Sequence, residues 1–377
     1  MIRNRAAQEP APSFTESDEN EFVRMAYRLT ADLAKPNALI YWADLLLSAL
    51  AGYGALAIWY VYGMTFVGLT AAIVSVLALY RCILFIHELT HLRKRTPRGF
   101  WTAWHALVGV PLLLPSFLYE GIHTLHHAKA NYGTEEDPEY IQWSTGRHRD
   151  VALMLPISAA EPLFLIVRFL FVTPMAALIP ATRPYVLERM SAMIMNPRFR
   201  RKEAPPFHTG WLVTEVATTL YAWTVLILTI AGIIPWQLVL MALAVWSGIS
   251  IINMVRTMVA HHYENDGEPV GALAQLLDTV NVPPPALLPM LWAPVGLRYH
   301  GLHHLLPNLP YHSLGAAHRR LLASLPADSP YSATISRRIS EVLARLFRNQ
   351  AVTRRERARL AQANPAAEAN IIGTPAE

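Results

Sequence analysis

Four long apolar runs constrain the possible folds of this chain more than any other feature of its sequence. They cover residues 39–60, 66–86, 211–233 and 236–255. At 1.5 Å per residue, a helix over the first run reaches about 33 Å, which is enough to cross the hydrocarbon core of a bilayer. A spanning segment must satisfy its backbone hydrogen bonds internally, so each run is predicted to be a transmembrane helix.

The composition agrees with a membrane protein. Of the 377 residues, 53% are hydrophobic and 16% charged, whereas soluble domains carry about a quarter of charged residues. The net charge of +5 is interpreted as a sign of topology and of attraction to anionic membrane lipids. No nucleic-acid-binding motif is present, so nucleic acid is not an expected partner. Cys82 is the single cysteine, which excludes an intrachain disulfide and a thiolate metal site.

The connections between the runs predict their orientation. The segments VYGMT and IPW, which join the runs in pairs, carry no charge. Basic residues lie at the other ends, in HLRKRTPR after the second run, in RFRRKE before the third and at Arg256 after the fourth. The excess of basic residues on the cytoplasmic side of membrane proteins therefore predicts two hairpins whose open ends face the cytoplasm.

Histidine clusters are the second outstanding feature of the chain. Ten of the fifteen histidines lie in four short clusters. A helix brings residues i, i+3 and i+4 to one face, so each cluster is predicted to point at one place. The clustered histidines are His87 and His91 in HELTH; His123, His126 and His127 in HTLHH; His261 and His262; and His300, His303 and His304 in HGLHH.

So many imidazoles predict metal binding. Neutral imidazole suits Fe, Zn, Cu and Ni. One ion takes roughly three to six ligands, so nine or ten histidines favour two ions. Glu88, Asp137 or Asp266 could accept the second ring N–H of a ligand histidine and fix its tautomer. Arg256 is either an orienting group for a carboxylate or lipid headgroup, or a basic anchor at the membrane surface.

A shared metal centre also constrains the remaining apolar stretches. All clusters must then lie on one membrane face, so each intervening segment must cross an even number of times. We therefore expect 101–118 to be re-entrant or interfacial and the proline-interrupted 151–180 to form interfacial helices. The predicted fold is an all-α integral membrane protein with four transmembrane helices in two hairpins and a cytoplasmic helical cap that carries the histidine clusters.

The domain limits follow from composition. Residues 1–20 are polar and expected to be disordered, without the apolar core of a signal peptide. Residues 21–348 are expected to form the membrane domain, and 349–377 a flexible charged tail. The Arg-rich, Lys-poor composition favours a bacterial inner-membrane protein with its active site on the cytoplasmic face.

An oxygen-activating pair of iron ions suits this position. Such a centre can abstract hydrogen from an unactivated C–H bond, which acid–base side chains cannot do, while the apolar spans could supply a tunnel for an alkyl chain.

The motifs HELTH, HTLHH and YHGLHHLLPNLPYHSL resemble the membrane fatty-acid desaturase superfamily over residues of about 39 to 325. That superfamily also contains hydroxylases and carotenoid ketolases. The resemblance implies four spans, a cytoplasmic cap and two iron ions (Fe2+/Fe3+) that use O2 and two electrons from an external donor. No His-Pro-Gly-Gly haem motif is present, so the donor should be a separate ferredoxin or cytochrome b5 type protein.

Carried over by motif, the resemblance implies nine metal ligands. His261 matches the ligand that follows the last span better than His262 does. Asp137 and Arg256 are expected around the ligands rather than among them. The implied ligands are His87, His91, His123, His126, His127, His261, His300, His303 and His304.

The preferred interpretation is an O2-dependent desaturase that introduces a double bond into a fatty acyl chain. Hydroxylation or ketolation of a lipid or carotenoid at the same kind of site is the alternative, because the reactions diverge only after hydrogen abstraction. A zinc intramembrane protease is a third hypothesis, since H-E-x-x-H with Glu88 as base is also its pattern. A protease zinc needs only three protein ligands, however. A metal-handling membrane protein would need ligands inside the spans, which are lacking. The bond position, acyl carrier, donor and oligomeric state are left open.

Overall fold

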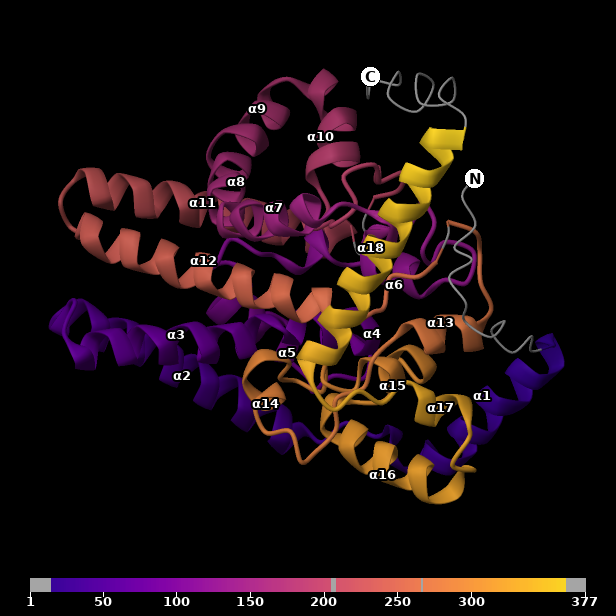
Figure 1. Ribbon diagram of the computed structural model, residues 1–377. Helices are drawn as coiled ribbons and strands as arrows, with labels where there is room; N and C mark the ends of the chain where they lie inside the picture. Colours follow the sequence, from indigo (N-terminus) through magenta and orange to yellow (C-terminus); the bar gives the residue numbers. More distant parts are fainter. Residues whose placement is uncertain (1–14, 205–207, 266, 364–377) are drawn as a thin grey trace.

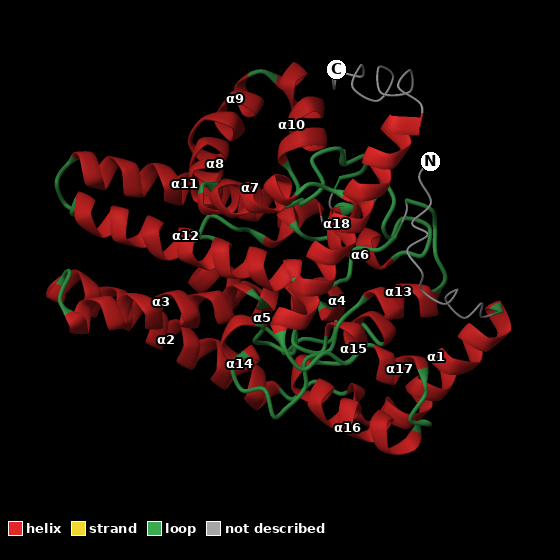
Figure 2. Cartoon of the chain, in the orientation of Figure 1, coloured by secondary structure: helices red, strands yellow, loops and turns green. Residues whose placement is uncertain are grey.

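The computed structural model describes residues 15–204, 208–265 and 267–363, and these residues form helices and loops without a β-strand (Figures 1 and 2). The expected all-helical fold is thus confirmed for the described residues. The helices are α1 (Glu16–Thr30), α2 (Ala38–Tyr62), α3 (Phe66–Ile83), α4 (Phe85–Leu92), α5 (Phe100–Trp104), α6 (Ile122–His127), α7 (His148–Ala159), α8 (Glu161–Val167), α9 (Thr173–Leu178), α10 (Arg183–Met190), α11 (His208–Ile230), α12 (Trp236–Met258), α13 (Ala272–Asp278), α14 (Pro289–Trp292), α15 (His300–Leu305), α16 (Leu314–Ser324), α17 (Pro330–Ala333) and α18 (Ile339–Ala363).

The four apolar runs form long helices in two adjacent pairs. Helices α2 and α3 are joined by the turn 63–65, and α11 and α12 by 231–235. Both pairs extend in the same direction in Figure 1. Leu84 keeps helical backbone angles between α3 and α4, so the chain continues as one apolar helical stretch from Phe66 to Leu92. The first histidine cluster therefore lies at the end of a candidate membrane span.

A fifth helical stretch is also long and apolar enough to cross a membrane. It covers Glu161–Leu178, within the segment expected to form interfacial helices. The prolines do not break it, because Pro162 and Pro174 lie in the first turns of α8 and α9, where proline is tolerated. A wider, π-helical turn at Arg168–Val172 joins the two helices. Within the described residues, the number of candidate spans is therefore five, where four were expected.

Residues 101–118 form a compact folded segment. Helix α5 runs into a π-helical turn at His105–Gly109, and a short 3-10 turn follows at Ser116–Leu118. Trp104 is fully buried and its indole N–H donates to the backbone oxygen of Cys82 at 2.8 Å. This segment is not among the candidate membrane spans of the described residues.

A group of helices lies at the opposite end of the molecule from the two turns (Figure 1). We call α1, α6, α13, α15, α16 and α17 the cap helices. Their apolar core includes Phe22, Leu302, Leu321 and Tyr331, all buried. By contrast, many apolar side chains of the long helices are exposed, as expected for a lipid-facing surface.

Helical structure extends into both segments that were expected to be irregular. Helix α1 begins at Glu16, where Thr15 forms a capping box with Asp18. Helix α18 continues through Ala363, and the Gln350 side chain donates to the backbone oxygen of Trp143 at 2.8 Å. Residues 1–14 and 364–377 lie outside the described residues.

Candidate metal centre

Nine histidines converge in two groups between the long helices and the cap helices. Within each group the facing nitrogen atoms all lie within 4.8 Å of one another. The first group contains His87, His91, His123, His127 and His303, and the second contains His126, His261, His300 and His304. These are the nine histidines that the sequence motifs singled out. His262, the alternative to His261, is buried but belongs to neither group.

Each H-x-x-H-H motif contributes to both groups. In HTLHH, His123 and His127 belong to the first group and His126 to the second. In HGLHH, His300 and His304 belong to the second group and His303 to the first. A helix advances about 100° per residue, so i and i+4 lie about 40° apart while i+3 lies about 60° to the other side. The prediction that each cluster points at one place was therefore wrong for the two H-x-x-H-H motifs, whose histidines are divided between two adjacent groups, but it holds for HELTH, whose two histidines both lie in the first group.

The ring nitrogens of the histidines face one another closely. Nε2 of His127 lies 3.0 Å from Nε2 of both His123 and His303. In the second group, Nε2 of His300 lies 2.9 Å from Nε2 of His261 and 3.1 Å from that of His304. Each Nε2 carries either one N–H or one lone pair, so Nε2 of His127 and Nε2 of His300 cannot form an N–H···N hydrogen bond with both of their neighbours, and at least one contact in each group places like groups against each other. A cation between them would remove that repulsion, so the donor set fits two metal ions.

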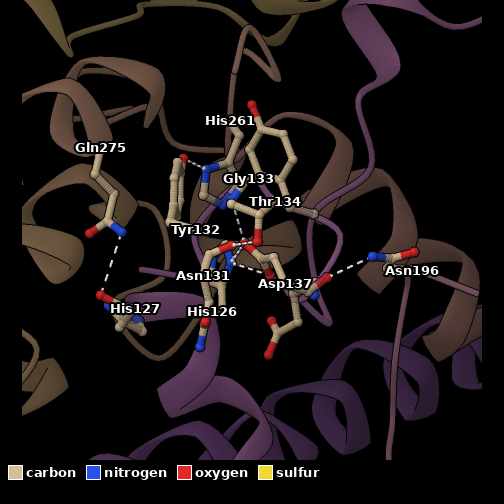
Figure 3. Close-up of polar contacts among 12 residues, drawn as sticks. His126, His127, Asn131, Tyr132, Gly133, Thr134, Asp137, Asn196, His261 and Gln275 are labelled. Carbon is tan, nitrogen blue, oxygen red and sulfur yellow. Dashed lines mark hydrogen bonds and ion pairs between the residues drawn. The ribbon is translucent and has the colours of Figure 1, made fainter. Parts of the chain in front are cut away.

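Acidic residues fix the orientation of the ring in at least two of the histidines. Asp137 accepts from Nδ1 of His126 at 3.0 Å, and Glu139 accepts from Nδ1 of His123 at 2.8 Å. The Asp137 carboxylate is itself held by the backbone N–H groups of Gly133 and Glu139, each at 2.9 Å. A proton fixed on Nδ1 leaves Nε2 free for a metal. Figure 3 shows the Asp137 side of this network.

A tyrosine relays a similar interaction to His261. The Tyr132 hydroxyl lies 2.8 Å from Nδ1 of His261 (Figure 3). The same hydroxyl donates to Asp278 at 2.7 Å. Because the hydroxyl proton is engaged by Asp278, the hydroxyl oxygen accepts from His261, and Nε2 of His261 again points into its group. The Tyr140 hydroxyl also donates to Asp278, at 2.8 Å.

Burial keeps most of the imidazoles outside the candidate spans neutral. Burial, helped by neighbouring histidines or Arg256, holds the pKa of these rings well below its usual value, which is the protonation state that a metal ligand needs. Burial also opposes the charge of His126, but the carboxylates of Asp137, Glu139 and Asp278 together outweigh it and raise the pKa of that ring. The neutral rings are His123, His127, His261, His300, His303 and His304.

Packing against a loop positions helix α15. The Asn281 side chain accepts from the backbone N–H of Leu302 at 3.0 Å and donates to the Thr334 hydroxyl at 2.6 Å. Gly301 makes this approach possible, because an added Cβ would lie 2.9 Å from both Asn281 Nδ2 and Thr279 Oγ1. The glycine between His300 and His303 is therefore required for the close fit of the third histidine motif.

The other carboxylates named from the sequence lie elsewhere. Glu88 accepts from the Tyr41 hydroxyl and from the backbone N–H of Tyr311 at 3.3 Å, and contacts no histidine ring by a hydrogen bond. This orientation argues against Glu88 as the base of a zinc protease. Asp266 lies outside the described residues.

Sequence reasoning did not identify Glu139, Tyr132 or Asp278. Glu139 follows Asp137 by two residues, and this proximity to a candidate carboxylate was the one available signal. Tyr132 and Asp278 lie in separate segments, and only the fold brings them to His261.

An elongated cavity reaches the first histidine group. Its volume is about 730 Å³, and His87, Tyr119 and Glu139 line it together with Arg256 and Thr257. Most of the remaining wall is apolar and comes from α3, α7, α8 and α12 and from residues 190–197. The apolar lining includes Ile83, Leu118, Met154, Ile157, Phe164, Leu165, Met193 and Met254. Such a cavity suits an alkyl chain that ends beside the histidines.

Comparison with known proteins agrees with this arrangement. The family model described as "Fatty acid desaturase" matches residues 65–335. A ceramide hydroxylase of Caulobacter vibrioides (strain NA1000 / CB15N) is 46% identical over 325 residues, which cover 86% of this chain and 93% of that protein. The resemblance carried by the histidine motifs is thereby confirmed: this chain belongs to the fatty acid desaturase family of oxidoreductases.

Proposed function

We propose that this protein is an O2-dependent lipid hydroxylase that acts on a ceramide-type substrate. The expected preference for desaturation is reversed by the similarity to a ceramide hydroxylase, which favours the hydroxylase alternative. The structural observation that carries the proposal is the apolar cavity with His87 in its wall. It offers a lipid chain access to the first histidine group.

The nine histidines would hold two iron ions, five rings around one and four around the other. Bound iron would supply the activation of O2 and the removal of hydrogen from an unactivated C–H bond. Asp137, Glu139 and Tyr132 keep the rings of His126, His123 and His261 oriented through Nδ1. These contacts fix the ligand set before substrate enters, which limits reorganisation during the reaction.

The reaction balances with an external source of electrons. One C–H bond becomes C–OH, the second oxygen atom leaves as water, and two electrons and two protons are consumed. A separate ferredoxin or cytochrome b5 type protein would deliver the electrons. We place the site on the cytoplasmic face of a bacterial inner membrane, where basic residues such as Arg93, Lys94 and Arg95 flank the first histidine motif.

The cavity walls contribute by excluding water and aligning the chain. Side chains such as Leu165 and Met254 offer no hydrogen bonds, so an alkyl chain displaces water there at a gain. Alignment of one carbon beside His87 would select the position that reacts.

The test is the mass of the product formed under isotopically heavy O2. Purified protein in lipid nanodiscs is supplied with a ceramide, a reductase and a ferredoxin. Hydroxylation predicts a product that gains one heavy oxygen atom. A product that has lost two hydrogens and gained no oxygen would establish desaturation instead and contradict the proposal.

A further inference from the structure

The cavity is not uniformly apolar, and its polar groups at the histidine end have unused hydrogen-bonding capacity. We propose that Arg256 and Glu139 bind the amide and hydroxyl groups of the lipid, so that oxidation occurs close to its polar end rather than in the middle of a chain. This inference rests on the proposed function and adds the orientation of the substrate.

The two ends of the cavity can be told apart along α12. Ser250 and Thr257 both line it and lie roughly 10 Å apart along the helix axis. The Ser247 hydroxyl donates to the backbone oxygen of Ala159 at 2.8 Å, so the junction of α7 and α8 meets α12 near Ser250. The apolar side chains of Ile157 and Phe164 therefore line the end away from Thr257.

Arg256 supplies hydrogen-bond donors at the histidine end. Its Nη2 donates to Asn253 at 3.1 Å, whereas its buried Nε has no hydrogen-bond partner among the described residues. A buried donor without a partner is costly, and such a group in a cavity wall calls for an explanation. A carbonyl or hydroxyl oxygen of the substrate would satisfy this guanidinium.

Glu139 supplies hydrogen-bond acceptors beside Arg256. Its two oxygens accept from Nδ1 of His123 at 2.8 Å and from the Tyr119 hydroxyl at 3.1 Å. A carboxylate can accept about four hydrogen bonds, so capacity remains for a donor from the lipid. Because Glu139 also orients His123, we treat it as a positioning residue for the metal site as well.

This pair of charges selects a particular ligand chemistry. A neutral group that both accepts and donates, such as an amide with a neighbouring hydroxyl, satisfies Arg256 and Glu139 together. A carboxylate would pair with Arg256 but has no hydrogen to donate to Glu139, and a plain hydrocarbon would leave both unpaired. The alkyl chains of the lipid would then extend from the polar end toward Ile157 and Phe164.

A second polar pair in the cavity provides the rival location. Glu161 and Ser250 both line the cavity, and Arg168, Arg189 and Arg200 are among the other polar residues of its wall. If the lipid amide were bound there, the carbon beside the histidines would lie some 10 Å farther along the chain.

The first experiment measures binding without turnover. Iron-free protein in nanodiscs is titrated with N-octanoyl-sphinganine and, separately, with a diol of the same chain length that lacks the amide. Arg256→Gln is expected to weaken binding of the amide lipid roughly 10-fold to 100-fold and to leave diol binding nearly unchanged. Arg256→Lys should recover part of the loss, since it restores a charged donor. The control Arg198→Gln removes a charge from an exposed ion pair and should bind like wild type.

The second experiment needs no variant. Wild-type protein is given ceramides of increasing chain length, and the position of the new oxygen is mapped by fragmentation mass spectrometry. The inference predicts a position that is constant when counted from the amide. A position that is constant from the methyl end would overturn it. In the binding titration of the first experiment, a loss of amide-lipid binding in Glu161→Gln but not in Arg256→Gln would overturn it as well. If wild-type protein oxidised no ceramide at all, the proposed function itself would fail, which is a different result.

Discussion

At the scale of single residues, the ligand types could be predicted from the sequence but their grouping could not. The spacing H-x-x-H-H identifies a shared helix face, and all nine predicted histidines do converge. Whether His126 turns toward His127 or toward His300 depends on two helices that are about 170 residues apart in the chain. No local pattern contains that information, because it is set by how α6 and α15 pack.

Asp137 is predicted to set the metal affinity of the second group. Asp137→Asn keeps an oxygen acceptor near His126 but removes the charge that favours an Nδ1 proton and a basic Nε2. Loss of such a partner typically lowers metal affinity about 10-fold to 100-fold. Iron titration of the apoprotein measures the change, with the exposed Glu135→Gln as the control. Equal affinities for Asp137→Asn and wild type would refute this role.

Gly301 is predicted to be intolerant of even one added carbon. In Gly301→Ala the new Cβ would press on Asn281 and Thr279 at 2.9 Å and displace α15 with its histidines. Gly315→Ala is the matched control, because its Cβ would meet only ordinary contacts, the nearest at 3.4 Å. We expect a lower melting temperature and a lower iron content for Gly301→Ala alone. Equal melting temperatures and iron contents in the two variants would contradict this prediction, because they would show that α15 accommodates the added Cβ.

At the scale of helices, hydropathy predicted the four long helices well. The proline content of residues 151–180, by contrast, led to the wrong expectation that no long helix would form there. The four apolar runs are helices within a few residues of their expected bounds. The stretch Glu161–Leu178 was expected to be interrupted by its prolines. These prolines lie in the first turns of α8 and α9, and a π-helical turn connects the two helices without a break. Whether the helical stretch is interrupted therefore depends on where the prolines lie within a helix, not on how many there are.

An ion pair fastens this stretch to α11. Arg168 Nη2 lies 2.6 Å from Glu215, and the two side chains are only 4% and 14% exposed. Removal of one partner from a buried pair leaves an uncompensated charge and costs about 3–5 kcal/mol. Glu215→Gln should therefore lower the melting temperature in detergent markedly. Glu135→Gln, which breaks the exposed pair with Arg198, should change it little, and comparable losses in both would contradict the assignment.

At the scale of the whole molecule, the assembled histidines restrict the topology. His127 of the first group and His261 of the second belong to adjacent groups, so any crossings of a membrane by the chain between them must be even in number. If the candidate spans α11 and α12 both cross, a third crossing by Glu161–Leu178 would be inconsistent with adjacent groups. We therefore propose four crossings, with α8 and α9 packed at the interface.

Cysteine labelling tests this topology in a Cys82→Ser background. Met64→Cys, in the turn between α2 and α3, should react with a membrane-impermeant maleimide from outside the cell. Lys94→Cys and Ala181→Cys should react only after the membrane is opened. Labelling of Ala181→Cys from outside intact cells would show that Glu161–Leu178 crosses and would refute the four-crossing proposal.

The central claim is that the two histidine groups hold two iron ions, and metal content per chain tests it most directly. Wild-type protein purified with iron present is expected to carry close to two iron ions, and His303→Ala, which removes one ligand of the first group, clearly fewer. His318→Ala is the control, since His318 belongs to neither group and its Nδ1 forms a hydrogen bond of 2.7 Å with the Tyr331 hydroxyl. A single zinc ion per chain, unaffected by His303→Ala, would contradict the account.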